Sequence, residues 1–138
     1  MGKYFGTDGF RGEAGVSLTA DHAFKIGRFW DGIIMNCAEE RERRCGQDCD
    51  RQGYRRSSYM FEYSLVGGLV ASGADAYLLH VTTTPSVAYV ARTDGFDCGI
   101  MISASHNPFY DNGIKLLNGN GQKIEAEVEA RIEAYLDG

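Results

Sequence analysis

Apolar residues recur at helical spacing in three parts of the chain. The first series covers residues 19–37, and Thr19 is suited to be its N-cap. The second covers 59–72, and the third covers 125–136 with apolar residues at four-residue steps. These segments are predicted to be helices with an apolar face. A shorter helix is predicted over 85–92, where a proline occupies the favoured first turn.

Short apolar runs lie between these helices and predict strands. The run at 76–81 follows a helix and is predicted to be a buried parallel strand. Residues 98–102 form the next strand. An Asp-Asn-Gly sequence at 111–113 is typical of a hairpin turn, and a brief strand over 114–117 follows it. The alternation of helices and strands indicates an α/β fold with at least part of its sheet parallel.

The size and charge of the chain narrow its function class. A length of 138 residues predicts a single domain, 1–138, which can bury a core without disulfides or metals. The net charge of -5 argues against a nucleic-acid partner. No apolar run is long enough to span a membrane, and no signal peptide is recognisable, so the expected location is cytoplasmic.

The four cysteines form no C-x-x-C pair. We interpret all four as reduced thiols. A zinc site formed by Cys37, Cys45 and Cys49 is the alternative, although no neighbouring histidine or second spaced pair supports it.

The strand at 98–102 leads into a polar turn that carries the main catalytic candidate, Ser105. Residues 102–108 read Ile-Ser-Ala-Ser-His-Asn-Pro. A serine hydroxyl needs aim and a neighbouring base or cation to act as a nucleophile, and backbone N–H groups on such a turn can hold phosphate oxygens. A lone serine would more often only cap a turn. The adjacent His106 and the downstream Lys115 favour a reactive serine over one that only caps a turn.

A glycine-rich segment at 6–12, Gly-Thr-Asp-Gly-Phe-Arg-Gly, is predicted to be a loop that approaches a ligand closely. The fork of Arg11 suits a phosphate dianion, and an exposed surface arginine is the alternative. Lys115 would neutralise phosphate charge or relay a proton, and a solvated lysine is again the alternative. His106 is interpreted as a hydrogen-bonding support rather than the base. The spacings match neither a G-x-S-x-G nucleophile elbow nor a P-loop, so the two segments indicate phosphate chemistry of another kind.

Segments 6–12 and 102–115 together closely resemble the α-D-phosphohexomutases. The Gly-Thr-Asp-Gly and Ser-Ala-Ser-His-Asn-Pro forms favour the bacterial phosphoglucosamine mutase branch over the phosphomannomutases and phosphoglucomutases. The resemblance covers nearly the whole chain. It implies the first domain of such an enzyme, the catalytic-serine domain. The implied fold is a three-layer α/β/α architecture with a mixed, mostly parallel sheet.

The resemblance also implies a mechanism. Ser105 would be carried as phosphoserine, and its phosphoryl group would interconvert glucosamine 6-phosphate and glucosamine 1-phosphate through glucosamine 1,6-bisphosphate. Arg11 would contact the phosphoserine, and Lys115 would be the proton-transfer candidate. One Mg²⁺ would bridge the phosphoserine and three aspartates. The family is further expected to act on a phosphosugar on the route to cell-wall amino sugars, and this branch is expected to form homodimers.

Two departures from the family pattern stand out. Family enzymes have four domains and this chain matches only the first, so Ser105 would be the single Mg²⁺ ligand here and the isolated chain is expected to be inactive. The segment 45–56 also lacks the family's apolar strand and the Asp-Thr pair of its Gly-x-Asp-Thr-Arg-x-Ser motif, in which Arg55 would be the arginine. One strand is therefore expected to be missing around 45–56.

Two other functions remain open from the sequence. The chain could be a non-catalytic phosphate-binding or interaction module that kept the fold, or a phosphohexomutase of different sugar specificity. The residues that grip the sugar would lie outside the chain.

Overall fold

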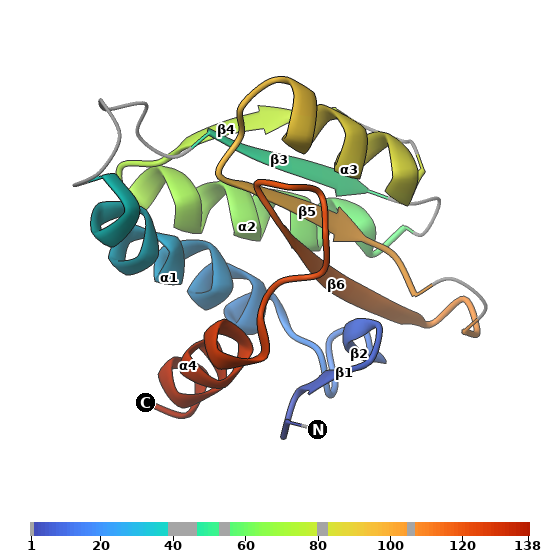
Figure 1. Cartoon of the computed structure of the whole chain (residues 1–138). Coiled ribbons are helices and arrows are strands. Elements are labelled where there is room, and N and C mark those ends of the chain that lie inside the picture. Colours follow the sequence, from blue (N-terminus) through green and yellow to red (C-terminus); the bar gives the residue numbers. More distant parts are fainter. Residues whose placement is uncertain (1, 39–46, 53–55, 80–82, 105–106) are drawn as a thin grey trace.

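A six-stranded sheet forms the middle of the molecule, and helices cover both of its faces (Figure 1). The computed structural model describes residues 2–38, 47–52, 56–79, 83–104 and 107–138, with side chains described outside 30–38 and 47–52. The elements in chain order are β1 (Phe5–Gly6), β2 (Gly9–Glu13), α1 (Ala20–Ala38), β3 (Gln47–Gln52), α2 (Ser58–Ala71), β4 (Asp75–Leu78), α3 (Thr84–Thr93), β5 (Cys98–Ile102), β6 (Asp111–Asn118) and α4 (Ala126–Asp137).

The strands lie in the order β1-β2-β6-β5-β3-β4. Strand β3 is parallel to both β5 and β4, whereas the β1-β2, β2-β6 and β6-β5 pairs are antiparallel. The three-layer α/β/α architecture and the mixed sheet are confirmed, but the expectation of a mostly parallel sheet is wrong. Strand β6 runs back along β5 because the connection between them is too short for a crossover.

The expectation of a missing strand around 45–56 is also wrong. Strand β3 occupies this segment and lies inside the sheet, where its residues 48–52 pair with β5 and its residues 47–50 pair with β4. The segment reads Gln-Asp-Cys-Asp-Arg-Gln, so no apolar run predicts it. The pairing uses backbone groups on both sides of β3, and these are independent of side-chain polarity. The neighbouring strand β4 is parallel as predicted, but it is an edge strand and largely exposed.

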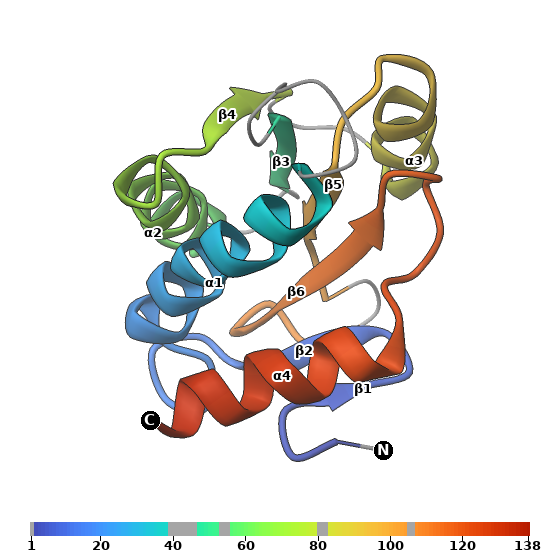
Figure 2. The ribbon, with the colours of Figure 1, turned by 60° about the vertical axis from the view of Figure 1, so that its left-hand side comes forward.

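Two cores lie on opposite faces of the sheet, and alternation along β5 and β6 assigns residues to them. Ile100 and Leu116 belong to the larger core with buried residues of α1, α2 and α4. Met101 and Leu117 belong to the smaller core with Val87 of α3. Figure 2 shows α3 on the side of the sheet away from α1 and α2. Cys98 is buried and forms no disulfide within the described residues, and the side chains of the other three cysteines lie outside the described set.

Helix α1 begins as its sequence predicts. The Thr19 hydroxyl accepts a hydrogen bond from the His22 backbone N–H at 3.3 Å, and His22 Nδ1 accepts one from the Thr19 N–H at 3.1 Å. This is a capping box in which histidine takes the place of the usual glutamate. Because Nδ1 must be unprotonated to accept, this agrees with the pKa of His22, which burial holds below its ordinary value.

Two predicted loops are strands in the structure. Residues 6–12 form most of the β1–β2 hairpin, in which Gly6 pairs with Gly9. Residues 111–113 begin β6, and the turn comes earlier, where the Asp111 N–H donates to the Pro108 carbonyl at 3.0 Å. Both segments are extended because β2 and β6 pair with each other through residues 10–13 and 111–114.

Candidate functional site

Arg11 lies on β2, directly opposite Gly113 of β6. A Cβ added to Gly113 would stand 3.0 Å from Arg11 Cγ and 2.6 Å from the Ser103 carbonyl oxygen. Opposed residues of an antiparallel pair point to the same face, so the Arg11 side chain passes over the place where Gly113 has no side chain. Glycine at 113 is therefore what lets Arg11 lie close to the serine-bearing segment.

Polar contacts fix the far end of Arg11. Its Nη1 donates to Asn107 Oδ1 at 3.4 Å, and its Nη2 is 3.7 Å from Asp8 Oδ2. Asn107 Nδ2 in turn donates to Asp111 Oδ2 at 3.2 Å. The Arg11 side chain is only 26% exposed, so these contacts restrain it well. The amide of Asn107 thus links β2 to the start of β6.

The two predicted residues at the centre of the motif, Ser105 and His106, lie outside the described residues. Their neighbours are placed. The Asn107 N–H donates to the Ala104 carbonyl at 3.0 Å, and the Ser103 N–H donates to the Gly113 carbonyl at 2.8 Å. Arg11 therefore contacts the residue two positions after Ser105, and the segment leading to Ser105 is bound to the strand under Arg11.

Lys115 lies on β6 two residues after Gly113 and opposite Met101 of β5. Alternate residues of a strand point to one face, so Lys115 and Arg11 share a face, at strand positions about 7 Å apart. Lys115 is half-buried, and no carboxylate of the described part of the chain pairs with it. Two of the four predicted residues, Arg11 and Lys115, thus form a pair of cations on one face of the sheet, and Arg11 also contacts Asn107.

Sequence reasoning missed the groups that hold Arg11. Gly113 was assigned to a turn, although its role depends on a strand pairing with residues a hundred positions away. Asp111 was assigned to the same turn, and its carboxylate accepts from Asn107. The signal that could have found them is the Asp-Asn-Gly-Ile-Lys sequence read as a strand, which places Asp111, Gly113 and Lys115 on one face.

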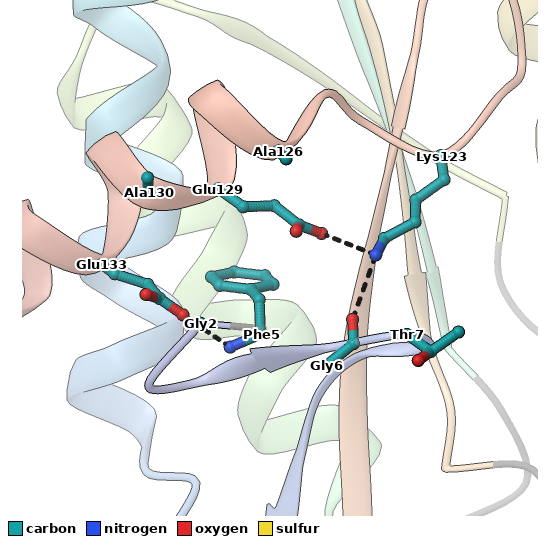
Figure 3. Close-up of a pocket in the computed structure, with 9 residues that line it drawn as sticks. All are labelled: Gly2, Phe5, Gly6, Thr7, Lys123, Ala126, Glu129, Ala130 and Glu133. Atoms are coloured by element: carbon teal, nitrogen blue, oxygen red, sulfur yellow. Dashed lines mark hydrogen bonds and ion pairs between the residues drawn. The ribbon is translucent and has the colours of Figure 1, made fainter.

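A separate pocket of ≈ 550 Å³ lies between the β1–β2 hairpin and α4 (Figure 3). Its lysine, Lys123, is already engaged, because Nζ lies 3.3 Å from Glu129 Oε1 and donates to the Gly6 carbonyl at 3.1 Å. No predicted site residue lines this pocket. The candidate phosphate site is therefore on the sheet face that carries Arg11 and Lys115, and not in this pocket.

The described residues meet the requirements of neither a metal-binding cluster nor a membrane-spanning helix. These residues contain no group of three histidine, cysteine, aspartate or glutamate side chains that could hold a metal ion. None of the helices in the same ranges combines the length and hydrophobicity needed to cross a bilayer.

Comparison with protein families identifies the domain. The model for phosphoglucomutase/phosphomannomutase, alpha/beta/alpha domain I, matches residues 2–138. The chain belongs to this family. Arg11, Lys115 and the motif at 102–108 therefore lie within the first domain of a phosphohexomutase.

Two relatives of high sequence identity are both phosphoglucosamine mutases. The phosphoglucosamine mutase of Lachnospira eligens is 68% identical over 140 residues, and that of Lachnoclostridium phytofermentans is 65% identical over 138. Each match covers 100% of this chain and 30% of the relative, so the chain spans under a third of their length.

A solved structure of a putative phosphomannomutase from Thermus thermophilus agrees in fold. It superposes with a TM-score of 0.82 at 26% identity, covering 96% of this chain and 29% of the other.

Proposed function

We propose that residues 1–138 form the single catalytic-serine domain of a phosphoglucosamine mutase, which interconverts glucosamine 6-phosphate and glucosamine 1-phosphate. One observation carries the proposal. Arg11 is bound to Asn107, two residues after Ser105, and shares a face of the sheet with the half-buried Lys115. Two cations close to a phosphoserine would suit phosphoryl transfer, which depends mainly on positioning and charge neutralisation.

The choice of sugar rests on the relatives. The two phosphoglucosamine mutases are 68% and 65% identical to the chain, whereas the putative phosphomannomutase is 26% identical. We therefore favour the amino sugar over mannose or glucose phosphates. No observation favours a non-catalytic binding module.

The proposed reaction has two transfers. In the first, the bond between Ser105 Oγ and phosphorus breaks while a sugar hydroxyl oxygen bonds to that phosphorus, which forms the 1,6-bisphosphate. The sugar hydroxyl loses its proton and the serine oxygen gains one. After the sugar reorients, Ser105 Oγ bonds to the phosphorus of the other phosphate while the bond from that phosphorus to the sugar oxygen breaks. Ser105 loses its proton, the sugar oxygen gains one, and the sugar monophosphate leaves. Arg11 holds phosphate oxygens through its fork, Lys115 neutralises charge and is the proton-transfer candidate, and His106 supports the turn.

The described residues do not by themselves fit a Mg²⁺ site, since no three suitable side chains converge. In the proposal, a phosphate on Ser105 supplies one ligand and the family's aspartates come from protein outside this chain. When bound, Mg²⁺ would neutralise charge on the transferring phosphoryl group. The sugar-binding parts, the homodimer contact and the cytoplasmic location belong to the same proposal, and the chain alone is expected to be inactive.

The test uses the full-length enzyme that contains this domain, assayed for glucosamine-phosphate isomerisation with Mg²⁺ and a trace of glucosamine 1,6-bisphosphate. We expect Ser105→Ala to abolish turnover and to leave the thermal unfolding midpoint unchanged. Ser103→Ala is the matched control and should remain active. Intact-mass and peptide mass spectrometry should find phosphate on Ser105. Phosphate on Ser103 alone, or turnover retained by Ser105→Ala, would overturn the assignment.

A further inference from the structure

A small polar cluster is buried between β6 and the first turn of α2. Among the residues whose side chains are described, the buried polar or charged ones are Ser58, Glu62 and Asn112. Asn112 Nδ2 donates to Ser57 Oγ at 2.8 Å and to Ser58 Oγ at 3.1 Å. Its Oδ1 accepts from the Gly113 N–H at 2.9 Å. Asn112 therefore has both ends of its amide engaged while it is 0% exposed.

This cluster lies on the opposite face of β6 from Arg11. Alternation along β6 places Asn112 on the face opposite Gly113, so its side chain points toward α2 while Arg11 lies on the other side of the same strand. Gly113, whose carbonyl accepts from the Ser103 N–H, is the next residue. The Asn112 amide therefore contacts the one stretch of β6 that both Arg11 and the serine-bearing segment use.

The cluster also reaches the segment after β3. Ser57 precedes α2, and Gln52 at the end of β3 pairs with Ile102 at the end of β5. The carboxyl ends of these two parallel strands therefore lie at the same end of the sheet, which is where α/β folds bind ligands. Asn112 ties the first turn of α2 to β6 across 54 positions of sequence.

An apolar side chain could fill this position without the desolvation cost of an amide. Buried polar networks are useful chiefly for fixing one arrangement, provided that each member is satisfied. We propose that Asn112 is a positioning residue for phosphoryl transfer: through Ser57, Ser58 and Gly113 it holds the start of α2, β6 and the serine turn in one register, so that Arg11 and Lys115 meet the phosphate on Ser105. This inference rests on the proposed function.

The first test compares Asn112→Ala with Asn118→Ala in the full-length enzyme. Asn118 is a matched control because it lies at the other end of β6, and its side chain bonds Glu125 and the backbone of residues 120 and 122. We expect Asn112→Ala to lower kcat by about 10- to 100-fold, since small misplacements of reacting groups cost that much. KM should change little, and Asn118→Ala should keep both constants. Equal kcat in the two variants would refute the inference.

A second readout does not depend on activity. In the 138-residue chain, amide hydrogen exchange of Ser103 and Asn107 should accelerate in Asn112→Ala, while that of Ile100 in the middle of β5 stays slow. Asn118→Ala should leave the Ser103 and Asn107 amides protected. Unchanged exchange at those two amides refutes the inference even if kcat falls.

The two proposals can fail separately. If Ser105→Ala stays active, the proposed function fails whatever the Asn112 variants do. If Ser105→Ala is inactive but Asn112→Ala keeps the wild-type kcat, only the positioning role fails. Should Asn112→Ala not fold, Ser58→Ala removes the buried acceptor alone and carries the same expectations for kcat and exchange. The double variant Asn112→Ala with Ser58→Ala should lower kcat by less than the product of the single effects.

Discussion

At the scale of single residues, the site depends on Gly113 having no side chain. Arg11 crosses β6 at Gly113, and the Ser103 carbonyl lies on the neighbouring side of the same point. A methyl group there would stand 2.6 Å from that carbonyl oxygen and 3.0 Å from Arg11 Cγ. One of these two groups would have to move: the carbonyl belongs to the segment that leads to Ser105, and the Cγ atom belongs to Arg11.

We therefore predict that Gly113→Ala lowers both the activity and the stability of the enzyme. Crowding of this kind costs about 1–3 kcal/mol in folding free energy, whereas displaced catalytic groups lower kcat by about 100-fold. The measurements are kcat of the full-length enzyme and its urea unfolding midpoint. Gly99→Ala is the control, because its methyl would crowd Val87 Cγ1 at 3.1 Å on the same face but beneath α3. A variant Gly113→Ala with normal kcat would contradict the proposed geometry.

At the scale of elements, the sequence predicted the helices and strands whose apolar residues follow directly from which of their faces are buried. Helices α1 and α4 and strand β5 were found at or near their observed ends, because each buries one face or lies wholly inside. Strand β3 was missed because its residues are polar and its place comes from backbone pairing with β5 and β4.

The candidate site divides in the same way. The motifs single out Arg11 and Lys115 as candidates, and both lie on one face of the sheet. The supports, Gly113 and Asn112, were read as a turn because their partners lie on β2 and α2, and a local pattern carries no information about such distant contacts.

The packing of α1 on α2 offers a test at this scale. The helices touch backbone to backbone: a Cβ at Gly27 would stand 2.5 Å from the Leu65 carbonyl oxygen, and one at Gly68 would collide with the Phe24 carbonyl oxygen. At the preceding residue, Gly67, a Cβ would make only an ordinary 3.8 Å contact with the Phe24 ring. Adjacent glycines of one helix thus have opposite surroundings.

We predict opposite signs for the two substitutions. Gly67→Ala should stabilise the chain by about 0.5–1 kcal/mol, since alanine loses less backbone entropy in a helix. Gly68→Ala should destabilise it by about 1–3 kcal/mol or more, because the helices must separate. Urea unfolding of the 138-residue chain measures both. Destabilisation by Gly67→Ala, or stabilisation by Gly68→Ala, would show that the helices do not cross at this point.

At the scale of the whole molecule, the two ends of the described chain are bound to each other. Glu133 of α4 accepts hydrogen bonds from the backbone N–H groups of Lys3, Tyr4 and Phe5 at 2.8–3.0 Å. Asp137 accepts from Lys3 Nζ at 2.7 Å and from the Tyr4 hydroxyl at 2.6 Å. Figure 3 shows Glu133 reaching from α4 to the backbone of Phe5. Helix α4 thereby anchors the start of the hairpin that carries Arg11.

This anchor should depend on pH. Burial opposes ionisation of Glu133, but the hydrogen bonds from Phe5, Tyr4 and Lys3 outweigh it and hold the pKa below the ordinary 4.5. A carboxyl whose pKa is lowered by folding contributes stability above its unfolded pKa and loses it as pH falls through the folded value. The contribution should thus be complete near pH 7 and should decline below about pH 4.5.

We predict that Glu133→Gln destabilises the chain by about 1–2 kcal/mol at pH 7, because an amide replaces one acceptor oxygen of the carboxylate with an NH2 group that can only donate. The difference in stability between wild type and variant should shrink as pH falls from about 4.5 toward about 3. In this range the wild-type carboxyl becomes protonated, and it is then neutral like the amide. Urea midpoints across this range measure it, and Glu127→Gln, at an exposed position of the same helix, is the control. If the gap between wild type and Glu133→Gln stays constant with pH, the carboxylate is not what holds the N-terminal segment. The position of the Arg11 hairpin must then be set by its ring contacts, such as that of Tyr4 with Phe10 at 5.2 Å between centroids.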